Sequence, residues 1–187
     1  MPPKVKTSKE TILSTAVEIV RTQGEQALNA RAVASVLGCS TQPIFSNFAT
    51  MEELRLAVAN EADTLYNHFI RREVESGEYP PYKASGMAYI RFAKEEKELF
   101  KLLFMRDRAG EETPKEFVIG QPVEGILHNT TGLDGEMAKL FHLEMWAYVH
   151  GIATMYATGF LDLEWELVSR MLTDAYQGLR KQYGMEG

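Results

Sequence analysis

The sequence has few of the residues that cross-link a chain or anchor it in a membrane. Its 187 residues include one cysteine, Cys39, so no internal disulfide can form and a reducing compartment is expected. No apolar run approaches the length of a membrane span, and residues 1–10 lack the apolar core of a signal peptide. These absences exclude a disulfide scaffold and predict a cytoplasmic protein with no membrane partner.

The sequence also lacks the recognised motifs of catalysis and metal binding. It contains four histidines, but none has His-Glu-x-x-His spacing, and Cys39 has no second cysteine to share a metal. There is no glycine-rich phosphate loop and no nucleophile elbow. We therefore expect no catalytic residue, no metal site and no cofactor. A helical enzyme is the alternative from another functional class.

Acidic residues outnumber basic ones, but unevenly along the chain. The formal net charge is −6, yet residues 1–50 carry five Lys or Arg against three Glu, a balance of +2. The rest of the chain therefore carries −8. Nucleic-acid affinity depends on local positive potential rather than on the total charge. The division is consistent with a small DNA-binding N-terminal part attached to an acidic body.

Residues 25–56 have the pattern of a helix-turn-helix. Asn29 can cap a short helix, and Gly38 ends it with a residue that tolerates positive φ. The apolar residues between them recur at helical spacing: Val33, Ala34, Val36 and Leu37. A second helix is expected from Ser40 or Thr41, with Pro43 in its first turn. Such a pair places the second helix in a major groove, although an ordinary helical hairpin is the alternative.

The segment continues as IFSNF over residues 44–48 and TMEEL over residues 50–54. Together with the turn glycine, this order and spacing resemble the TetR family of bacterial transcriptional regulators over residues 8–60. The resemblance implies an N-terminal three-helix DNA-binding domain, residues 1–50. It also implies a helical ligand-binding and dimerisation domain, residues 51–187.

Two residues depart from the family pattern. The family usually has Tyr where this chain has Phe45, and Lys where it has Met51; both family residues commonly contact DNA phosphates. The chain thus lacks two backbone anchors, which leaves its DNA affinity open. Thr50 and Glu53 are spaced as a capping box, and the free N–H groups of the helix that begins there can meet a phosphate.

The resemblance places the DNA contacts on and around the second helix of the motif. The expected DNA-binding residues are Lys6, Arg31, Ser40, Thr41, Gln42, Pro43, Phe45, Ser46, Asn47 and Thr50. Gln42 is the expected base reader, because a glutamine amide can pair bidentately with adenine. Lys4, Lys6 and Lys9 can form an N-terminal arm that lies along the DNA backbone. The implied partner is a double-stranded palindromic operator.

The remaining chain is expected to be helical, which makes the whole an all-α fold of about nine helices. The longer helices are expected near 7–22, 51–75, 82–94, 96–107, 135–158 and 162–183. Thr7 and Glu10 predict a capping box for the first helix. Glycine and proline are dense between 108 and 136, which predicts a broken helix with mobile loops.

The last two helices are expected to form a homodimer. The first of these two helices, near 135–158, is apolar on more than one face, as expected of a helix that packs against its own core and a partner. The predicted interface residues are Tyr148, Ile152, Met155, Val168, Met171, Leu172, Ala175 and Leu179. A fully buried helix in a monomer gives the same pattern. The TetR resemblance favours the dimer, since those proteins pair through their final two helices.

An unusual number of aromatic and methionine residues lies in the second domain. The predicted ligand-binding residues are Tyr89, Phe92, Phe100, Phe104, Met105, Phe141, Met145, Trp146, His150 and Tyr156. Such surfaces suit an apolar or aromatic small molecule, with His150 or Tyr156 as a polar anchor. Simple core packing is the alternative for each residue. Trp146, His150 and Gly151 resemble a Trp-x-x-x-His-Gly stretch of one TetR subgroup, in which a structural role for His150 is also expected.

Taken together, the resemblance implies a TetR-like dimeric regulator that a small-molecule effector releases from its operator. A repressor is expected, and the sequence leaves an activator open. The helix near 51–75 would link the two domains. Two alternatives remain open: a response to oxidation of Cys39, and a response to a protein partner. A buried cysteine also commonly acts as a small hydrophobic residue.

Overall fold

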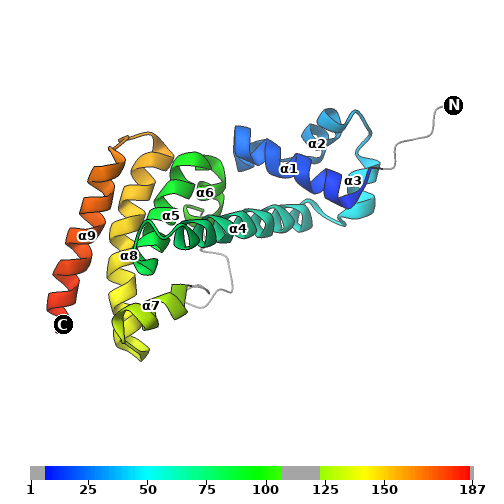
Figure 1. The fold of residues 1–187 in the computed structure, drawn as a ribbon. Coiled ribbons are helices and arrows are strands. Elements are labelled where there is room, and N and C mark those ends of the chain that lie inside the picture. The colour runs from blue at the N-terminus through cyan, green and yellow to red at the C-terminus, as the bar shows by residue number, and fades with distance from the viewer. Residues whose placement is uncertain (1–6, 107–122, 186–187) are drawn as a thin grey trace. The chain divides into compact units, whose positions relative to one another are not determined.

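The computed structural model describes residues 7–106 and 123–185 (Figure 1). Nine α-helices and one 3₁₀ turn, without any strand, make up this part of the chain, which confirms the all-α prediction. The helices fall into two compact units. Unit 1 contains the chain up to Leu65 and the segment Glu96–Arg106; unit 2 contains Tyr66–Glu95 and the described residues from 123 onward. The functional boundary expected at residue 50 stays a prediction.

Unit 1 contains the expected helix-turn-helix. Its elements are α1 (Lys9–Gln23), η1 (Glu25–Ala27), α2 (Ala30–Leu37), α3 (Gln42–Asn47), the first part of α4 (Met51–Ser76) and α6 (Lys97–Phe104). Helix α1 packs on α2, α3 and α6. The core of the unit is apolar and fully covered, and it includes Ile12, Ala16, Val20, Val33, Ile44, Phe48 and Leu54. Burial of these side chains positions α3 at the surface of the unit.

The helix ends in unit 1 follow local capping chemistry. The Asn29 side chain accepts hydrogen bonds from the backbone N–H groups of Arg31 (3.1 Å) and Ala32 (3.0 Å), as predicted. Gly38 ends α2 in the left-handed conformation, with φ of 63°. The cap of α1 was wrong by one residue: Ser8, not Thr7, accepts from the Thr11 N–H at 3.2 Å.

The apolar face predicted for α2 also needs one correction. Val33 and Ala34 are buried, but Val36 is 65% exposed. Residues 33 and 36 both match a three- or four-residue spacing. In a helix of eight residues, however, the neighbouring helices cover only a narrow stripe, and Val36 lies outside it. Val36 instead lies at a shallow groove along α1 that also includes Ser14, Thr15, Glu18, Ile19, Thr22 and Gln23.

Unit 2 is built around α5 (Pro81–Glu95), α8 (Gly135–Thr158) and α9 (Trp165–Gln182), which pack side by side (Figure 1). Helix α7 (Val123–Thr131) packs on α5 and α8. Helix α8 has the predicted bounds, whereas α9 begins three residues later than expected. Within the predicted broken segment 108–136, α7 is one helix; residues 107–122 lie outside the described chain.

A close approach within this layer occurs at Gly86 of α5. A Cβ atom at this position would lie 3.1 Å from Leu172 Cδ2 of α9 and 3.6 Å from Val149 Cγ2 of α8. Leu172 and Val149 are themselves buried. The missing side chain therefore allows three helices to pack at one point, which offsets the lower helix propensity of glycine.

In the two described segments, no helix is both long enough and apolar enough to cross a membrane.

Candidate functional site

The residues predicted to contact DNA lie on α2, α3 and the turns beside them. Gln42, Phe45 and Ser46 are exposed on α3, whereas Pro43 and Asn47 are half-buried and Ile44 is buried. Pro43 stands in the first turn of α3, where no intrahelical donor is lost. Ser40 is exposed in the turn, and Thr41 precedes α3 without a side-chain cap. The exposed surface of α3 is thus small and is formed mainly by Gln42, Phe45 and Ser46.

Two of the polar side chains on α3 already donate hydrogen bonds to their own helix. Ser46 Oγ donates to the Gln42 carbonyl at 2.9 Å, and Asn47 Nδ2 donates to the Pro43 carbonyl at 2.8 Å. These bonds turn both donors toward the helix backbone rather than outward. Gln42 is therefore the exposed amide of α3 whose side chain is best placed to read a base.

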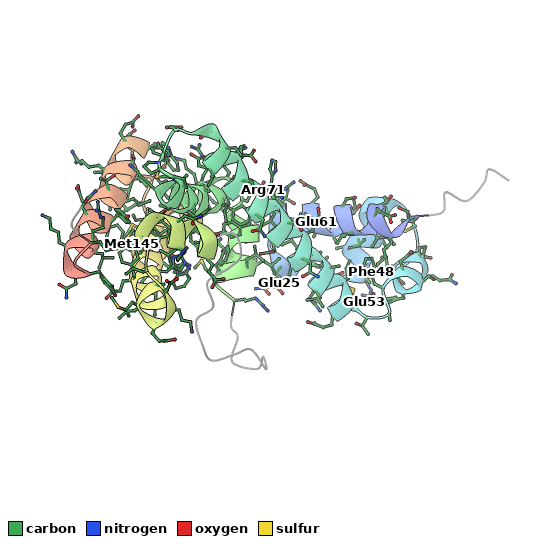
Figure 2. The ribbon with its side chains drawn as sticks, turned by 60° about the horizontal axis from the view of Figure 1, so that its bottom comes forward. Glu25, Phe48, Glu53, Glu61, Arg71 and Met145 are labelled. Atoms are coloured by element: carbon green, nitrogen blue, oxygen red, sulfur yellow. The ribbon has the colours of Figure 1, made fainter. Side chains whose placement is uncertain are left out.

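The residues around α3 differ in how accessible their polar groups are. Arg31 is exposed at the start of α2. Thr50 accepts from the Glu53 N–H at 3.1 Å, and Glu53 accepts from the Ala49 N–H at 2.7 Å, so the predicted capping box is present in a shifted form. Phe48 and Glu53 both lie near the start of α4 (Figure 2). Lys6, like Lys4, lies outside the described residues.

Lys9, the third lysine of the predicted arm, belongs to unit 1 itself. Its ammonium lies 3.5 Å from a Glu53 carboxylate oxygen and 4.7 Å from the centre of the Phe48 ring. Lys9 therefore joins α1 to the start of α4 within unit 1, and its place in a DNA-contacting arm stays a prediction.

A polar group between α5 and α8 is formed by Tyr89, His150 and Trp146. The Tyr89 hydroxyl lies 2.8 Å from His150 Nδ1, and it also accepts a hydrogen bond from the Trp146 side chain. The Trp146 and His150 rings stack with their centres 4.7 Å apart, as the four-residue spacing predicts. Burial raises the pKa of Tyr89 and lowers the pKa of His150, so both groups stay neutral at pH 7.

A second pair repeats this arrangement about two helical turns earlier. The Tyr82 hydroxyl lies 2.8 Å from His142 Nδ1. Burial raises the pKa of Tyr82 well above its usual value and lowers the pKa of His142 to about 4. The Phe141 ring lies 6.1 Å from Tyr82 and contacts Tyr176 and Tyr183. The earlier tyrosine of α5 pairs with the earlier histidine of α8, and the later with the later, so the two helices run in the same direction.

Sequence reasoning missed the repetition of these pairs, although the signal was present. Tyr82 and Tyr89 are seven apart, while His142 and His150 are eight apart, so each pair of residues shares a helix face. Sequence reasoning also missed Tyr66 and Phe69 of α4, whose rings lie 5.8 Å from Tyr89 and 5.4 Å from Phe92, respectively. Their helix was treated as a link between domains, which hid its aromatic contribution to unit 2.

The ten predicted ligand-binding residues divide between the two units. Phe100, Phe104 and Met105 belong to unit 1, where the first two rings lie 5.1 Å apart. The other seven belong to unit 2: Tyr89, Phe92, Phe141, Met145, Trp146, His150 and Tyr156. Among these, Trp146 and His150 are half-exposed and the others are buried. The half-exposed pair is the part of the set that a molecule from solution can reach in unit 2.

Tyr156 does not offer the polar anchor that the sequence suggested. Its hydroxyl donates to the Leu163 carbonyl at 2.6 Å, and the side chain is 2% exposed. Lys94 lies 4.9 Å from the centre of its ring and forms an ion pair with Asp162 at 2.7 Å. Tyr156 therefore holds the turn between α8 and α9, and His150 is left as the candidate anchor.

Three of the residues predicted for the dimer interface are buried within the single chain. Ile152, Val168 and Leu172 are each 3% exposed or less, so their side chains have no surface to offer a partner. The sequence pattern marked them correctly as apolar but could not separate the inward face from the outward one. Tyr148 is exposed, and the remaining predicted residues are half-buried: Met155, Met171, Ala175 and Leu179.

An exposed stripe on α8 is better placed for such an interface. Leu140, Ala147 and Gly151 are exposed and follow one another on the same helix face, with Tyr148 beside them. No atom lies within 4 Å of a Cβ built at Gly151, and the same holds for Gly178 of α9. Glycine within an exposed helix costs about 1 kcal/mol relative to alanine, which close approach of another backbone would offset.

Cys39 is half-exposed in the turn between α2 and α3 and carries a free thiol. Among the residues whose placement is described, no three His, Cys, Asp or Glu side chains gather as a metal site.

Comparison with known proteins relates this chain to a family of helical regulators. The family model of the tetracyclin repressor-like C-terminal domain matches residues 82–175, about half of the chain. A comparison with curated protein sequences finds no match.

Three solved structures share the fold. A protein of unknown function from Rhodococcus sp. RHA1 has a TM-score of 0.74 at 22% identity, covering 95% of this chain and 98% of that one. A TetR-like transcriptional regulator from the same organism has a TM-score of 0.64 at 14% identity, with 96% and 98% covered. A TetR family member from Streptomyces coelicolor A3 has a TM-score of 0.57 at 16% identity, with 92% and 98% covered.

The half-buried His142 predicts a loss of stability in acid. Its pKa is about 4 in the folded chain and about 6.5 when unfolded, so between these values only the unfolded chain binds the proton. Stability should therefore fall as the pH drops from 6.5 to 4, by up to about 1.4 kcal/mol per pH unit from this group. His142→Gln should flatten the urea-unfolding free energy over that range, and the exposed His68→Gln should not. Equal slopes in both variants would contradict the assignment.

Proposed function

Because this chain belongs to the tetracyclin repressor-like (TetR) family of transcriptional regulators, we propose that it is a homodimeric repressor. It binds a palindromic DNA operator through α3 and leaves it when an apolar or aromatic small molecule binds unit 2. The observation that carries the DNA-binding part is the pair of exposed side chains on α3, Gln42 and Phe45, displayed by a capped helix-turn-helix.

The geometry of unit 1 supports insertion of α3 into a major groove. Gln42 and Phe45 are three residues apart and therefore neighbours on one helix face. Arg31, at the start of α2, is available for a phosphate, as is usual for the first helix of such a motif, which crosses the DNA backbone.

The exposed stripe of α8 supports pairing of two copies. A dimer is needed because one α3 reads a half-site, and two half-sites lie about one helical turn, roughly 34 Å, apart or a multiple of it. Exposed apolar and glycine positions on α8, together with Gly178 on α9, are typical of helices that pack closely against a partner.

The Trp146–Tyr89–His150 group supports an effector site in unit 2. Its rings are apolar and partly accessible, while its hydrogen-bonded polar atoms can orient a ligand. A ligand releases DNA only if it binds the DNA-incompetent conformation more tightly. An aromatic molecule that stacks on Trp146 and hydrogen-bonds at His150 is the class that this group favours.

The DNA-binding proposal predicts different roles for Gln42 and Arg31. Gln42→Ala should weaken binding to the selected operator by about 1–3 kcal/mol per half-site while leaving binding to random DNA unchanged. Arg31→Ala should weaken both equally and reduce the salt dependence by about one phosphate contact per half-site. Fluorescence anisotropy over a salt series measures both quantities. The assignment fails if the two variants lose affinity alike on both duplexes.

The dimer proposal predicts that Gly151→Leu separates the protomers without unfolding them. In the single chain a Cβ at this position meets no atom, so the substitution should not lower the melting temperature of the isolated protomer. In a dimer the added side chain would hold the two helices apart. Sedimentation should therefore report monomers for Gly151→Leu.

Gly125→Leu on α7 is the matched control, since its Cβ also meets no atom within 4 Å. It should sediment as the wild type does. A wild-type protein that sediments as a monomer, or a dimeric Gly151→Leu variant, would refute the proposed interface.

The effector proposal predicts that Tyr89→Phe reduces the response to a ligand. Aromatic compounds that bind should raise the melting temperature of the wild type, by mass action on the folded state, and release operator DNA. Tyr89→Phe keeps the ring but removes the hydroxyl that joins Trp146 to His150, so it should respond less while binding ligand-free operator normally. Tyr82→Phe is the control. If a broad aromatic library neither stabilises the protein nor releases DNA, this part of the function is wrong.

A further inference from the structure

Phe45 is an exposed aromatic residue in a position where exposure has a cost. Its side chain is 48% exposed on α3, one turn after Gln42. Within the described chain the ring has no stacking or cation–π partner, unlike the buried Phe48, which lies under Lys9. A large apolar ring left in water on a short surface helix indicates a contact that the single chain does not make.

The chemistry of the ring restricts what that contact can be. Phenylalanine has neither a donor nor an acceptor, so it cannot bind a phosphate oxygen or a polar base edge. In the major groove the apolar group available to it is the C5 methyl of thymine, which side chains such as phenylalanine contact. Cytosine presents an amino donor at the groove edge and no methyl group.

We propose that Phe45 is a specificity-determining residue that contacts the thymine methyl group in each operator half-site. The inference rests on the proposed function, because it places α3 in a major groove. Gln42 lies on the same face, three residues earlier, and its amide suits adenine. Gln42 and Phe45 thus read A·T pairs at one or two neighbouring positions, by an amide and by an apolar ring.

The neighbouring side chains leave this role to Phe45. Ser46 and Asn47 turn their donors onto the carbonyls of Gln42 and Pro43, and Ile44 is buried in the core. Pro43 has no N–H and is half-buried. Along the second turn of α3, Phe45 is the side chain with both the exposure and the reach for an apolar contact in the groove.

The test removes the methyl group from the DNA instead of the ring from the protein. The probe is the duplex selected from random DNA on the immobilised wild-type dimer. Each thymine is then replaced in turn by deoxyuridine, which pairs identically but lacks the methyl group. At one thymine position, present once in each half-site, deoxyuridine should weaken wild-type binding about fourfold per half-site. This factor corresponds to about 0.8 kcal/mol per buried methyl group. Phe45→Ala should bind the thymine and deoxyuridine duplexes equally.

The control variant is Val36→Ala, which truncates an exposed apolar residue of the same unit away from α3. It should keep the full response to deoxyuridine, and circular dichroism should report folded protein for both variants. Specific operator binding that ignores deoxyuridine at every position would overturn the inference while leaving DNA binding intact. A deoxyuridine effect that persists in Phe45→Ala would also overturn it. If the wild type selects no sequence, the proposed function itself fails.

Discussion

The packing of α5 against α8 includes two partly buried hydrogen bonds between tyrosine hydroxyls and histidine rings. Burying either the hydroxyl or the ring nitrogen without a hydrogen-bond partner would destabilise the folded chain. Tyr82 must therefore face His142, and Tyr89 must face His150, at 2.8 Å in both cases. A slide of one helix along the other would break both bonds together. Apolar contacts alone tolerate such slides far better, so the two bonds fix the register of the layer.

The same bonds connect the core of unit 2 to its accessible aromatic surface. Tyr89 is buried between the Tyr66 ring and the His150 nitrogen, whereas Trp146, stacked on His150, remains half-exposed. A molecule that displaces the Trp146 ring disturbs an atom on which the register of two long helices depends.

Much of the fold followed from the sequence because its local signals are strong. Asn29, Gly38 and Pro43 each impose a specific backbone state, and the structure has a cap, a left-handed turn and a helix start at these residues. The bounds of α8 followed from a glycine at each end. Failures arose where local signals compete, as at Thr7 and Ser8, both of which can cap a helix.

The sites were harder to predict, because they depend on which face of each helix turns inward. Ile152, Val168 and Leu172 carry the same apolar character as an interface, and only the packing of α5 against α8 and α9 shows that they are covered. Likewise, the spacing of Tyr82 and Tyr89 places both on one face of their helix, but it does not identify His142, 60 residues from Tyr82 in the chain, as a partner. Pairs of this kind come from tertiary packing, which the spacing of residues within one helix does not contain.

The close approach at Gly86 links the evolution of two distant positions. A Cβ atom at residue 86 would lie 3.1 Å from Leu172 Cδ2, so Leu172 would have to shift, and a larger residue at 86 favours a smaller one at 172. Related chains that preserve this three-helix contact should therefore vary these two positions in a compensating manner. Where both have changed, their combined volume should be conserved more closely than either residue.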